Sequence, residues 1–234
     1  MHNKRDEKAV VLLSGGLDSA TVAAIAKDEG YDIYALTFLY GQMHSIEIES
    51  AKKIAAFLDV ENHMIIELPL GSFANSSLTG VGKIPMGRNM NEISSGIPST
   101  YVPGRNIIFL SYAVSYAESI GANNVFIGVN SIDFSGYPDC RQEFIDAFQK
   151  AVDTGTKAGV EGKKGIRIRA PLINLSKREI IEKGLSLNLD YSLTHSCYSP
   201  KENGMPCGKC DSCIIRSNAF KEIGIDDPLI MLFS

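Results

Sequence analysis

Short apolar runs alternate along the chain with longer stretches in which apolar residues recur every three or four positions. The short runs stop at glycine, serine or proline, which is typical of buried β-strands, whereas the longer stretches favour amphipathic helices. The pattern predicts strands at residues 8–13, 31–39, 62–68, 124–129 and 166–170. It predicts helices from 17 to Gly30, over 45–58 and 105–120, from 141 into the 150s, and from Ser176, which has capping-box spacing to Glu179, to 187.

This order of strands and helices predicts an α/β fold with a doubly wound, mainly parallel sheet, because parallel strands need crossover connections. The crossovers are expected to be right-handed. Ligands in such sheets bind at the carboxyl ends of the strands. Polar residues that directly follow a predicted strand are therefore the first candidates for a functional site.

Two segments interrupt the pattern. Residues 69–103 are rich in glycine, serine, asparagine and proline, and a loop of that length is usually functional or disordered. Residues 155–165 form a second loop, and the last 45 residues contain cysteines, turns and one short final helix. We predict an α/β domain over residues 1–188 and a small C-terminal subdomain over 189–234.

The composition is that of a globular protein and excludes several classes. Of 234 residues, 44% are hydrophobic and 21% are charged, and 23 basic against 27 acidic side chains give a net charge of −4. Disorder, collagen and coiled coil are excluded for the whole chain. The mild acidity argues against broad nucleic-acid binding, which needs a basic surface.

The first residues, the apolar stretches and the cysteines indicate the compartment of the protein. Residues 1–8 are charged and precede no apolar signal region, and the apolar stretches are far shorter than a membrane span. We expect a cytoplasmic protein with no membrane partner. Four of the five cysteines fall between residues 197 and 213, which in a reducing compartment indicates metal binding rather than disulfides.

The first strand is followed by a candidate phosphate-binding loop, Ser-Gly-Gly-Leu-Asp-Ser at residues 14–19. Two glycines let the backbone approach an anion, and the N–H groups at the start of the next helix suit phosphate. Asp18 would repel phosphates unless a cation such as Mg²⁺ lay between them. The alternative is a tight turn in which Asp18 or Ser19 caps the helix. The loop is neither a Walker loop nor a dinucleotide fingerprint.

Two further polar loops follow predicted strands and are expected at the same edge of the sheet. Residues 40–44 follow the second strand, and residues 130–141 follow the fourth. The alternative for the second loop is a surface turn in which Asp139 caps the next helix. Cys140 is as compatible with a small buried residue as with a reactive one.

Arg105 begins a predicted helix, where the helix dipole favours anionic rather than cationic residues. A cation placed against that preference indicates an anionic partner such as phosphate or carboxylate. A solvated charge is the alternative. Among the histidines, His63 is expected to be structural, and His44 lies at the ligand edge.

The spacing Cys197-x9-Cys207-x2-Cys210-x2-Cys213 is a second strong motif. Four thiolates match a closed tetrahedral zinc site, which leaves no position for water and therefore indicates a structural role. An iron–sulfur cluster is the competing interpretation. His195 lies close enough in sequence to join the site, although four cysteines suffice.

Together these motifs resemble known proteins. Residues 14–19 resemble the pyrophosphate-binding loop of the ATP pyrophosphatase superfamily. The loop, residues 40–42 with His44, residues 102–106, the string Asp-Phe-Ser-Gly-Tyr-Pro-Asp-Cys at 133–140 and the four cysteines occur in an order that resembles the 7-cyano-7-deazaguanine synthases. The chain departs from many members at Ala20 and at residues 130–132.

The resemblance implies a Rossmann-like sheet of the adenine nucleotide alpha-hydrolase type and an ATP-dependent carbon–nitrogen ligase that forms 7-cyano-7-deazaguanine. The substrate carboxylate of 7-carboxy-7-deazaguanine is adenylated, ammonia displaces AMP to give an amide, and a second adenylation with loss of AMP leaves the nitrile. The partners implied are these small molecules, with Mg²⁺, structural Zn²⁺ and a second subunit in a homodimer.

The resemblance also implies roles for individual residues. The catalytic group comprises Ser14, Asp18, Ser19 and Arg105. The nucleotide would be bound by Leu13, Ser14, Gly15, Gly16, Leu17, Asp18, Ser19, Ala20 and Thr21. The substrate would be bound by Tyr40, Gln42, His44, Arg105, Asn106, Asp133, Ser135, Gly136, Tyr137 and Asp139. The alternatives are another enzyme of this superfamily, such as a tRNA thiolase, and a non-catalytic nucleotide-binding zinc module.

Overall fold

The computed structural model describes residues 7–42, 46–132, 136–162 and 165–233. Five parallel strands form one sheet in the order β3-β2-β1-β4-β5, which confirms the predicted fold class. The strands are β1 (Lys8–Leu12), β2 (Asp32–Leu39), β3 (Asn62–Glu67), β4 (Asn124–Phe126) and β5 (Arg167–Arg169). The helices are α1 (Leu17–Asp28), α2 (Ile46–Phe57), α3 (Met90–Ile93), α4 (Arg105–Ile120), α5 (Gln142–Gly155), α6 (Lys157–Val160), α7 (Lys177–Ser186), α8 (Asp211–Glu222) and α9 (Pro228–Met231).

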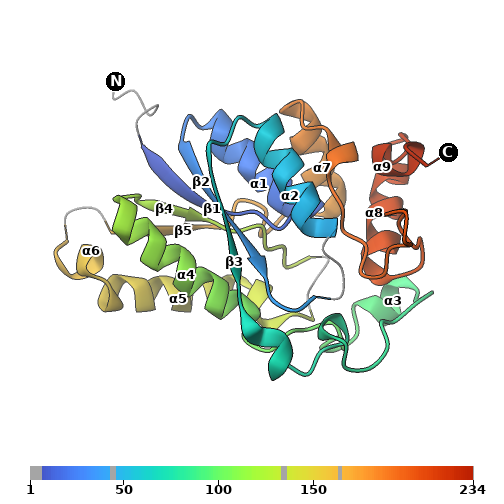
Figure 1. Ribbon diagram of the computed structural model, residues 1–234, viewed down its shortest axis with the longest axis horizontal. Helices are drawn as coiled ribbons and strands as arrows, with labels where there is room; N and C mark the ends of the chain where they lie inside the picture. The colour runs from blue at the N-terminus through green and yellow to red at the C-terminus, as the bar shows by residue number, and fades with distance from the viewer. Residues whose placement is uncertain (1–6, 43–45, 133–135, 163–164, 234) are drawn as a thin grey trace.

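Two helical layers cover the sheet (Figure 1). Alternate residues of the central strand β1 enter the two cores, because successive side chains of a strand point to opposite faces. Ala9 and Val11 pack with α1, α2, α7 and α8. Val10 and Leu12 pack with α4 and α5. The apolar run at the start of the chain is thus explained by a strand that is buried on both faces.

Local sequence features end and begin the helices as predicted. Helix α1 ends where Gly30 adopts a left-handed conformation with φ of 86°. Ser176 and Glu179 form a capping box at the start of α7, in which each side chain bonds the other residue's backbone N–H group.

Several predicted boundaries are wrong. Strand β4 ends at Phe126, because the chain then runs over the start of α1, where a Cβ atom on Gly128 would lie 3.0 Å from the Ser19 nitrogen. The long 69–103 segment contains 3-10 turns at Pro69–Ser72 and Ser77–Thr79 and the short helix α3. The second loop contains α6, and the last 45 residues contain α8 and α9 rather than one helix.

The C-terminal segment packs into the same core as the sheet. Tyr191 of the turn Tyr191–Leu193 and Phe220 of α8 are fully buried beside α1 and α7. The Tyr191 hydroxyl bonds the Ile180 carbonyl oxygen at 3.0 Å and the Thr21 hydroxyl at 2.8 Å. The division of the chain at residue 188 remains a prediction, and residues on both sides of it contribute to one apolar core.

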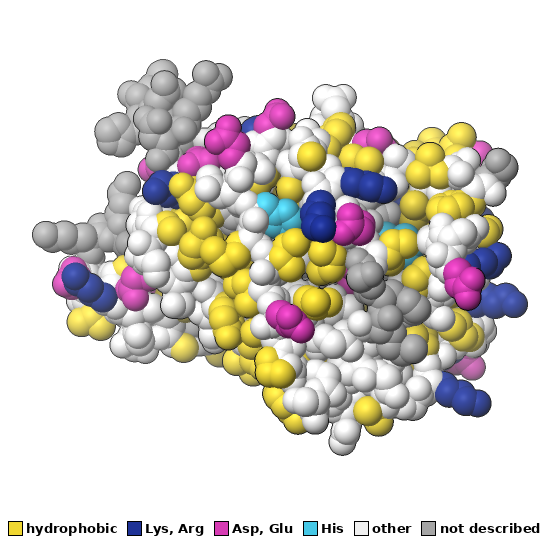
Figure 2. All heavy atoms as spheres, in the orientation of Figure 1, with side chains coloured by type: hydrophobic (Ala, Val, Ile, Leu, Met, Phe, Trp, Pro, Cys, Tyr) yellow, Lys and Arg dark blue, Asp and Glu magenta, His cyan; other side chains and the backbone are white. Residues whose placement is uncertain are grey.

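Strand β3 lies at the edge of the sheet and leaves apolar side chains exposed. Met64 and Ile65 of β3 are 43% and 42% exposed, and Phe57 at the end of α2 is 45% exposed. Figure 2 shows hydrophobic side chains gathered on the face where β3 lies in front. Among the described residues, no helix combines the length and apolar character that crossing a membrane requires.

Candidate active site

A cavity of about 250 Å³ opens beyond the carboxyl ends of β1 and β4. The strand order reverses between these two strands, because β1 connects through α1 on one face whereas β4 is reached through α4 on the other. Ligands of doubly wound sheets bind at this switch point. The cavity wall carries residues from all three of the predicted polar loops: Ser14, Asp18 and Ser19; Tyr40 and Gln42; and Asn130, Tyr137 and Cys140.

The phosphate loop is held in a shape that only glycine permits. Gly15 has φ of +88°, and a Cβ atom there would lie 2.1 Å from the Glu47 carbonyl oxygen. The Ser19 hydroxyl accepts a hydrogen bond from the Ser14 backbone N–H group at 3.1 Å. Gly16 is the N-cap of α1, and neither Asp18 nor Ser19 caps this helix, so that alternative is wrong. The Leu17 N–H group instead donates to the Ser196 hydroxyl of the C-terminal segment at 3.4 Å. The remaining N–H groups at such a helix N-terminus suit an anion.

The predicted nucleotide-binding residues take three kinds of position. Leu13, Ser14, Gly16, Leu17, Asp18 and Ser19 lie on the cavity wall. Ala20 and Thr21 instead face the core, where the Thr21 hydroxyl donates to the Leu17 carbonyl oxygen at 2.9 Å. Gly15 acts through the backbone shape just described.

Lys177, the first residue of α7, holds the carboxylate of Asp18. Its Nζ atom lies 2.6 and 2.7 Å from the two carboxylate oxygens, and the two side chains are 9% and 19% exposed. Sequence reasoning missed Lys177, although it sits at a helix N-terminus against the dipole preference, as Arg105 does. A lysine at this position supplies the positive charge that Asp18 needs beside an anion.

Arg105 lies at the start of α4 against Tyr40. Its Nη1 atom donates to the Tyr40 hydroxyl at 3.3 Å, and the guanidinium lies 5.7 Å from the centre of the Tyr40 ring. Burial raises the pKa of Tyr40, with Arg105 acting in the opposite direction. Both residues line the cavity, so the alternative of a solvated arginine is wrong.

Gln42 closes the end of β2 with its amide group. Its Oε1 atom accepts from the Tyr40 backbone N–H group at 2.7 Å, and its Nε2 atom donates to the Phe38 carbonyl oxygen at 3.3 Å. Gln42 lines the cavity, and its Oε1 and Nε2 atoms each retain one further hydrogen-bonding position.

Asp139 caps a helix, but not the one that follows it. Its carboxylate accepts from the Asn106 backbone N–H group of α4 at 3.3 Å, and its carbonyl oxygen accepts from the Asn106 amide at 3.1 Å. Asp139 is buried behind the cavity, and Gly136 also lies off its wall. Asn106 and Tyr137 line it, and so does Cys140, a buried thiol whose pKa burial raises to about 12.

Three predicted substrate-binding residues, His44, Asp133 and Ser135, lie outside the described residues. The cavity is also lined by polar residues outside the predicted set: Glu47, Lys177, Ser196, Tyr198, Ser212 and Arg216. The last four of these come from the C-terminal segment. Because that segment follows the last predicted strand, no strand-end argument could have placed it at the site.

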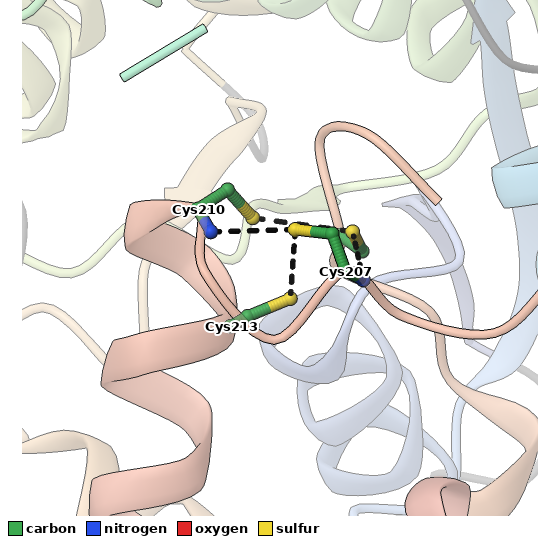
Figure 3. Close-up of side chains that lie close together, drawn as sticks. Cys207, Cys210 and Cys213 are labelled. Carbon is green, nitrogen blue, oxygen red and sulfur yellow. Dashed lines mark hydrogen bonds between the residues drawn. The ribbon is translucent and has the colours of Figure 1, made fainter. Parts of the chain in front are cut away.

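The four cysteines Cys197, Cys207, Cys210 and Cys213 form one cluster, whose sulfur atoms all lie within 4.8 Å of one another. The Cys207 and Cys213 sulfurs are 4.0 Å apart, as are those of Cys197 and Cys210. Figure 3 shows the sulfurs of Cys207, Cys210 and Cys213 facing one another. Tetrahedral Zn–S bonds of about 2.3 Å would place the sulfurs about 3.8 Å apart, so the cluster fits a single metal ion.

Backbone N–H groups donate hydrogen bonds to the sulfurs of this cluster. Cys207 donates to the Cys197 sulfur at 3.2 Å, and Cys210 donates to the Cys207 sulfur at 3.3 Å. Such donors stabilise thiolates, the form that binds metal. The His195 ring bonds the Gly204 carbonyl oxygen at 3.1 Å and is not among the clustered ligands.

The long loop joins the cysteine cluster to the site. Met86 pairs with Cys210 as an antiparallel bridge, and the Gly87 N–H group donates to the Lys209 carbonyl oxygen at 2.8 Å. The Arg88 guanidinium forms a salt bridge with Asp211 at the start of α8. Cys197 and Tyr198 line the cavity, so a metal at the cluster would support one of its walls.

Comparison with known proteins agrees with this architecture. A 7-cyano-7-deazaguanine synthase of Syntrophus aciditrophicus (strain SB) is 54% identical over 222 residues, which cover 95% of this chain and 96% of that protein. A 7-cyano-7-deazaguanine synthase of Desulfatibacillum aliphaticivorans is 52% identical over 228 residues, 97% of this chain and 98% of that protein.

A solved structure shares the fold at low sequence identity. The NMN synthetase from Francisella tularensis superimposes with a TM-score of 0.50 and 17% identity, covering 94% of this chain and 78% of that one. The family model described as "Queuosine biosynthesis protein QueC" matches residues 8–224. The chain therefore belongs to the QueC family of queuosine biosynthesis proteins.

Proposed function

We propose that this chain is an ATP-dependent carbon–nitrogen ligase that converts 7-carboxy-7-deazaguanine and ammonia into 7-cyano-7-deazaguanine. A carboxylate is a poor electrophile, because its oxygen is a poor leaving group. Transfer of adenylate from ATP to that oxygen supplies a better one and releases pyrophosphate. Ammonia then gives the amide with loss of AMP, and a second adenylation with loss of AMP leaves the nitrile.

The observation that supports this proposal most strongly is that the phosphate loop, Lys177 and Arg105 line one cavity at the switch point of the sheet. The reaction brings a triphosphate and a carboxylate together, and these two anions repel each other. Two cationic side chains on opposite elements, α7 and α4, would offset that repulsion as the reactants approach.

Pyrophosphate is assigned to the loop after β1. Ser14 and Ser19 would donate hydroxyl hydrogen bonds, and N–H groups at the start of α1 would face the phosphates. Lys177 would stabilise the charge that builds on the leaving pyrophosphate. Asp18 has the oxygen ligands that Mg²⁺ prefers, so it would hold Mg²⁺ together with phosphate oxygens, and the ion would neutralise their charge.

The deazaguanine is assigned to the opposite side of the cavity. Arg105 would bind its carboxylate, and Tyr40, Gln42, Asn106 and Tyr137 offer donors and acceptors for a purine-like edge. His44, Asp133 and Ser135 complete this proposed set. Asp139 and Gly136 would act through the position of α4 and of the loop before Tyr137.

We assign Zn²⁺ to the cysteine cluster, with residues 189–234 as the subdomain that it stabilises. The sulfur separations of 4.0 Å suit one tetrahedral ion, whereas an iron–sulfur cluster lies between its cysteines and holds their sulfurs further apart. Metal analysis of the purified protein tests this assignment. One zinc per chain supports it, and iron with acid-labile sulfide contradicts it.

A homodimer is proposed through the exposed edge of β3. An edge strand that leaves Met64 and Ile65 exposed is a ready surface for pairing with another chain. Ile65→Lys is expected to shift the protein to monomer in sedimentation analysis. A wild-type protein that is monomeric throughout the tested concentrations would contradict the proposal.

The reaction is tested by incubating the purified protein with ATP, Mg²⁺, ammonium and 7-carboxy-7-deazaguanine and following the products by mass spectrometry. Formation of the nitrile with two AMP for each product is the expected result. AMP without nitrile would support adenylation but indicate that the adenylate group is transferred to a different acceptor. No AMP under any of these conditions would reject the enzyme.

A further inference from the structure

Glu47 stands in the first turn of α2, directly against the phosphate loop. Its carbonyl oxygen is the atom that a Cβ on Gly15 would meet at 2.1 Å. Its side chain is partly buried and lines the same cavity as Arg105 and Asp18. Glu47 therefore shares one cavity with the loop assigned to pyrophosphate and with the arginine assigned to the substrate carboxylate.

The two carboxylates of this cavity wall differ in their surroundings. Asp18 is bound by Lys177 at 2.6 and 2.7 Å. Across the described ranges, no hydrogen bond or salt bridge engages the Glu47 carboxylate, although Arg105 acts on it electrostatically over a longer distance. Asp18 is thus paired with Lys177 in this structure, whereas the Glu47 carboxylate has no such partner among the described residues.

The surroundings of the Glu47 carboxyl favour its protonated form. Burial raises the pKa of its carboxyl to about 7, against the opposing effect of the Arg105 guanidinium. The titratable groups that face it are Arg105 from α4 and Tyr40 after β2, and Asp18 and Lys177 pair with each other on the cavity wall. A group with a pKa near the working pH is suited to accept and release a proton.

The proposed reaction needs such a group in both half-reactions. When ammonia attacks the acyl carbon, the adduct nitrogen carries three hydrogens and a positive charge. One proton must leave as the carbon–oxygen bond to AMP breaks and the amide forms. After the second adenylation, both remaining N–H protons leave as the second AMP departs and the nitrile forms.

We propose that Glu47 is the catalytic base that accepts protons from the reacting nitrogen in both half-reactions. This inference rests on the proposed function. Amide formation releases one proton and nitrile formation releases two. The Glu47 carboxylate accepts these protons one at a time, becoming a carboxylic acid and passing each proton to water before it accepts the next. A carboxylate in this position could instead recognise the N–H groups of the deazaguanine, and the kinetic constants separate the two roles.

The test compares Glu47→Gln with Glu49→Gln, a control in the same helix whose side chain is 61% exposed and pairs with Lys52. Two reactions are measured: substrate-dependent exchange of labelled pyrophosphate into ATP without ammonium, and ammonium-dependent nitrile formation. For Glu47→Gln we expect exchange close to that of the wild type and a fall in kcat for nitrile formation of about 10²-fold or more. Glu49→Gln should leave both reactions unchanged.

The pH profile gives a second readout that a structural role would not move. Once the ionisation of ammonium is allowed for, the wild-type rate should rise with pH through a pKa near 7. That limb should be absent in Glu47→Gln and present in Glu47→Asp. Thermal melting checks that the variants are folded.

Three results would overturn the inference. Loss of exchange together with nitrile formation would place Glu47 in adenylation. A raised KM for the deazaguanine with unchanged kcat would assign Glu47 to substrate recognition. An unaltered pH profile in Glu47→Gln would show that Glu47 is not the catalytic base. Absence of exchange in the wild type would instead reject the proposed function, so the two failures are distinguishable.

Discussion

The Lys177 ammonium lies 2.6 and 2.7 Å from the two carboxylate oxygens of Asp18, and it joins the start of α7 to the first turn of α1. The two residues are 159 positions apart in the chain, and both line the cavity. Because both side chains are largely buried, removing either one leaves the other without its counter-charge. This pair therefore links the stability of the phosphate loop to its chemistry.

Replacing Asp18 by Asn should abolish AMP formation while leaving the fold intact. The substitution keeps the shape of the side chain but removes the negative charge that pairs with Lys177 and that would bind Mg²⁺. Release of AMP is measured together with the circular dichroism spectrum. Full activity in the variant would defeat the assignment of Asp18.

Replacing Lys177 by Met should lower AMP formation by about 10²-fold or more, because a positive charge at the leaving pyrophosphate is lost. We also expect a loss of roughly 1–3 kcal/mol in the free energy of unfolding, since the Asp18 carboxylate loses its hydrogen-bond donor. Lys183→Met, an exposed position in the same helix, is the control. Equal activity in the two variants would contradict the role of Lys177.

Glu47→Gln should change the pH dependence of stability in the ligand-free protein. Folding raises the pKa of Glu47 from 4.5 to about 7, so the folded state holds more protons than the unfolded state between these values. Its contribution to stability is present below pH 4.5 and is lost as the pH rises through 7. Glutamine cannot ionise, so the variant should gain on the order of 2 kcal/mol over the wild type between pH 5 and pH 8. Parallel urea titrations at both pH values measure this gain, and a constant difference would contradict the raised pKa.

Gly184→Ala tests the packing of the C-terminal segment against α7. A Cβ atom at Gly184 would lie 1.9 Å from the hydroxyl of the buried Tyr191, whose hydrogen bonds to Ile180 and Thr21 fix its ring. We expect a loss of about 1–3 kcal/mol in the free energy of unfolding. Gly155→Ala, where a Cβ meets nothing within 4 Å, should be neutral or slightly stabilising. Equal melting temperatures would show that the contact is not tight.

Much of the fold could be predicted from the sequence because local pattern and tertiary context agree. The apolar run before Ser14 is buried on both faces, and Gly30 and Ser176 end and begin helices by local backbone rules. The sequence predicts too long a strand β4, because the apolar residues that follow Phe126 leave the sheet and pass over α1.

The site could be predicted only where it follows strands. Ser14, Tyr40 and Tyr137 belong to loops after strands, and all three line the cavity. Lys177 lies at a helix start, and Tyr198 reaches the cavity from the cysteine segment, so their approach depends on tertiary packing. Asp139 has the residue type of a ligand, but its hydrogen bond to Asn106 turns it into a cap of α4.

The most direct test of the account follows the oxygen atoms of the substrate. 7-Carboxy-7-deazaguanine labelled with ¹⁸O in both carboxylate oxygens is incubated with the protein, unlabelled ATP, Mg²⁺ and ammonium, and the AMP is analysed by mass spectrometry. Two adenylations of substrate oxygen predict two AMP for each nitrile, each carrying one ¹⁸O atom. Nitrile accompanied by unlabelled AMP would contradict adenylation of the substrate.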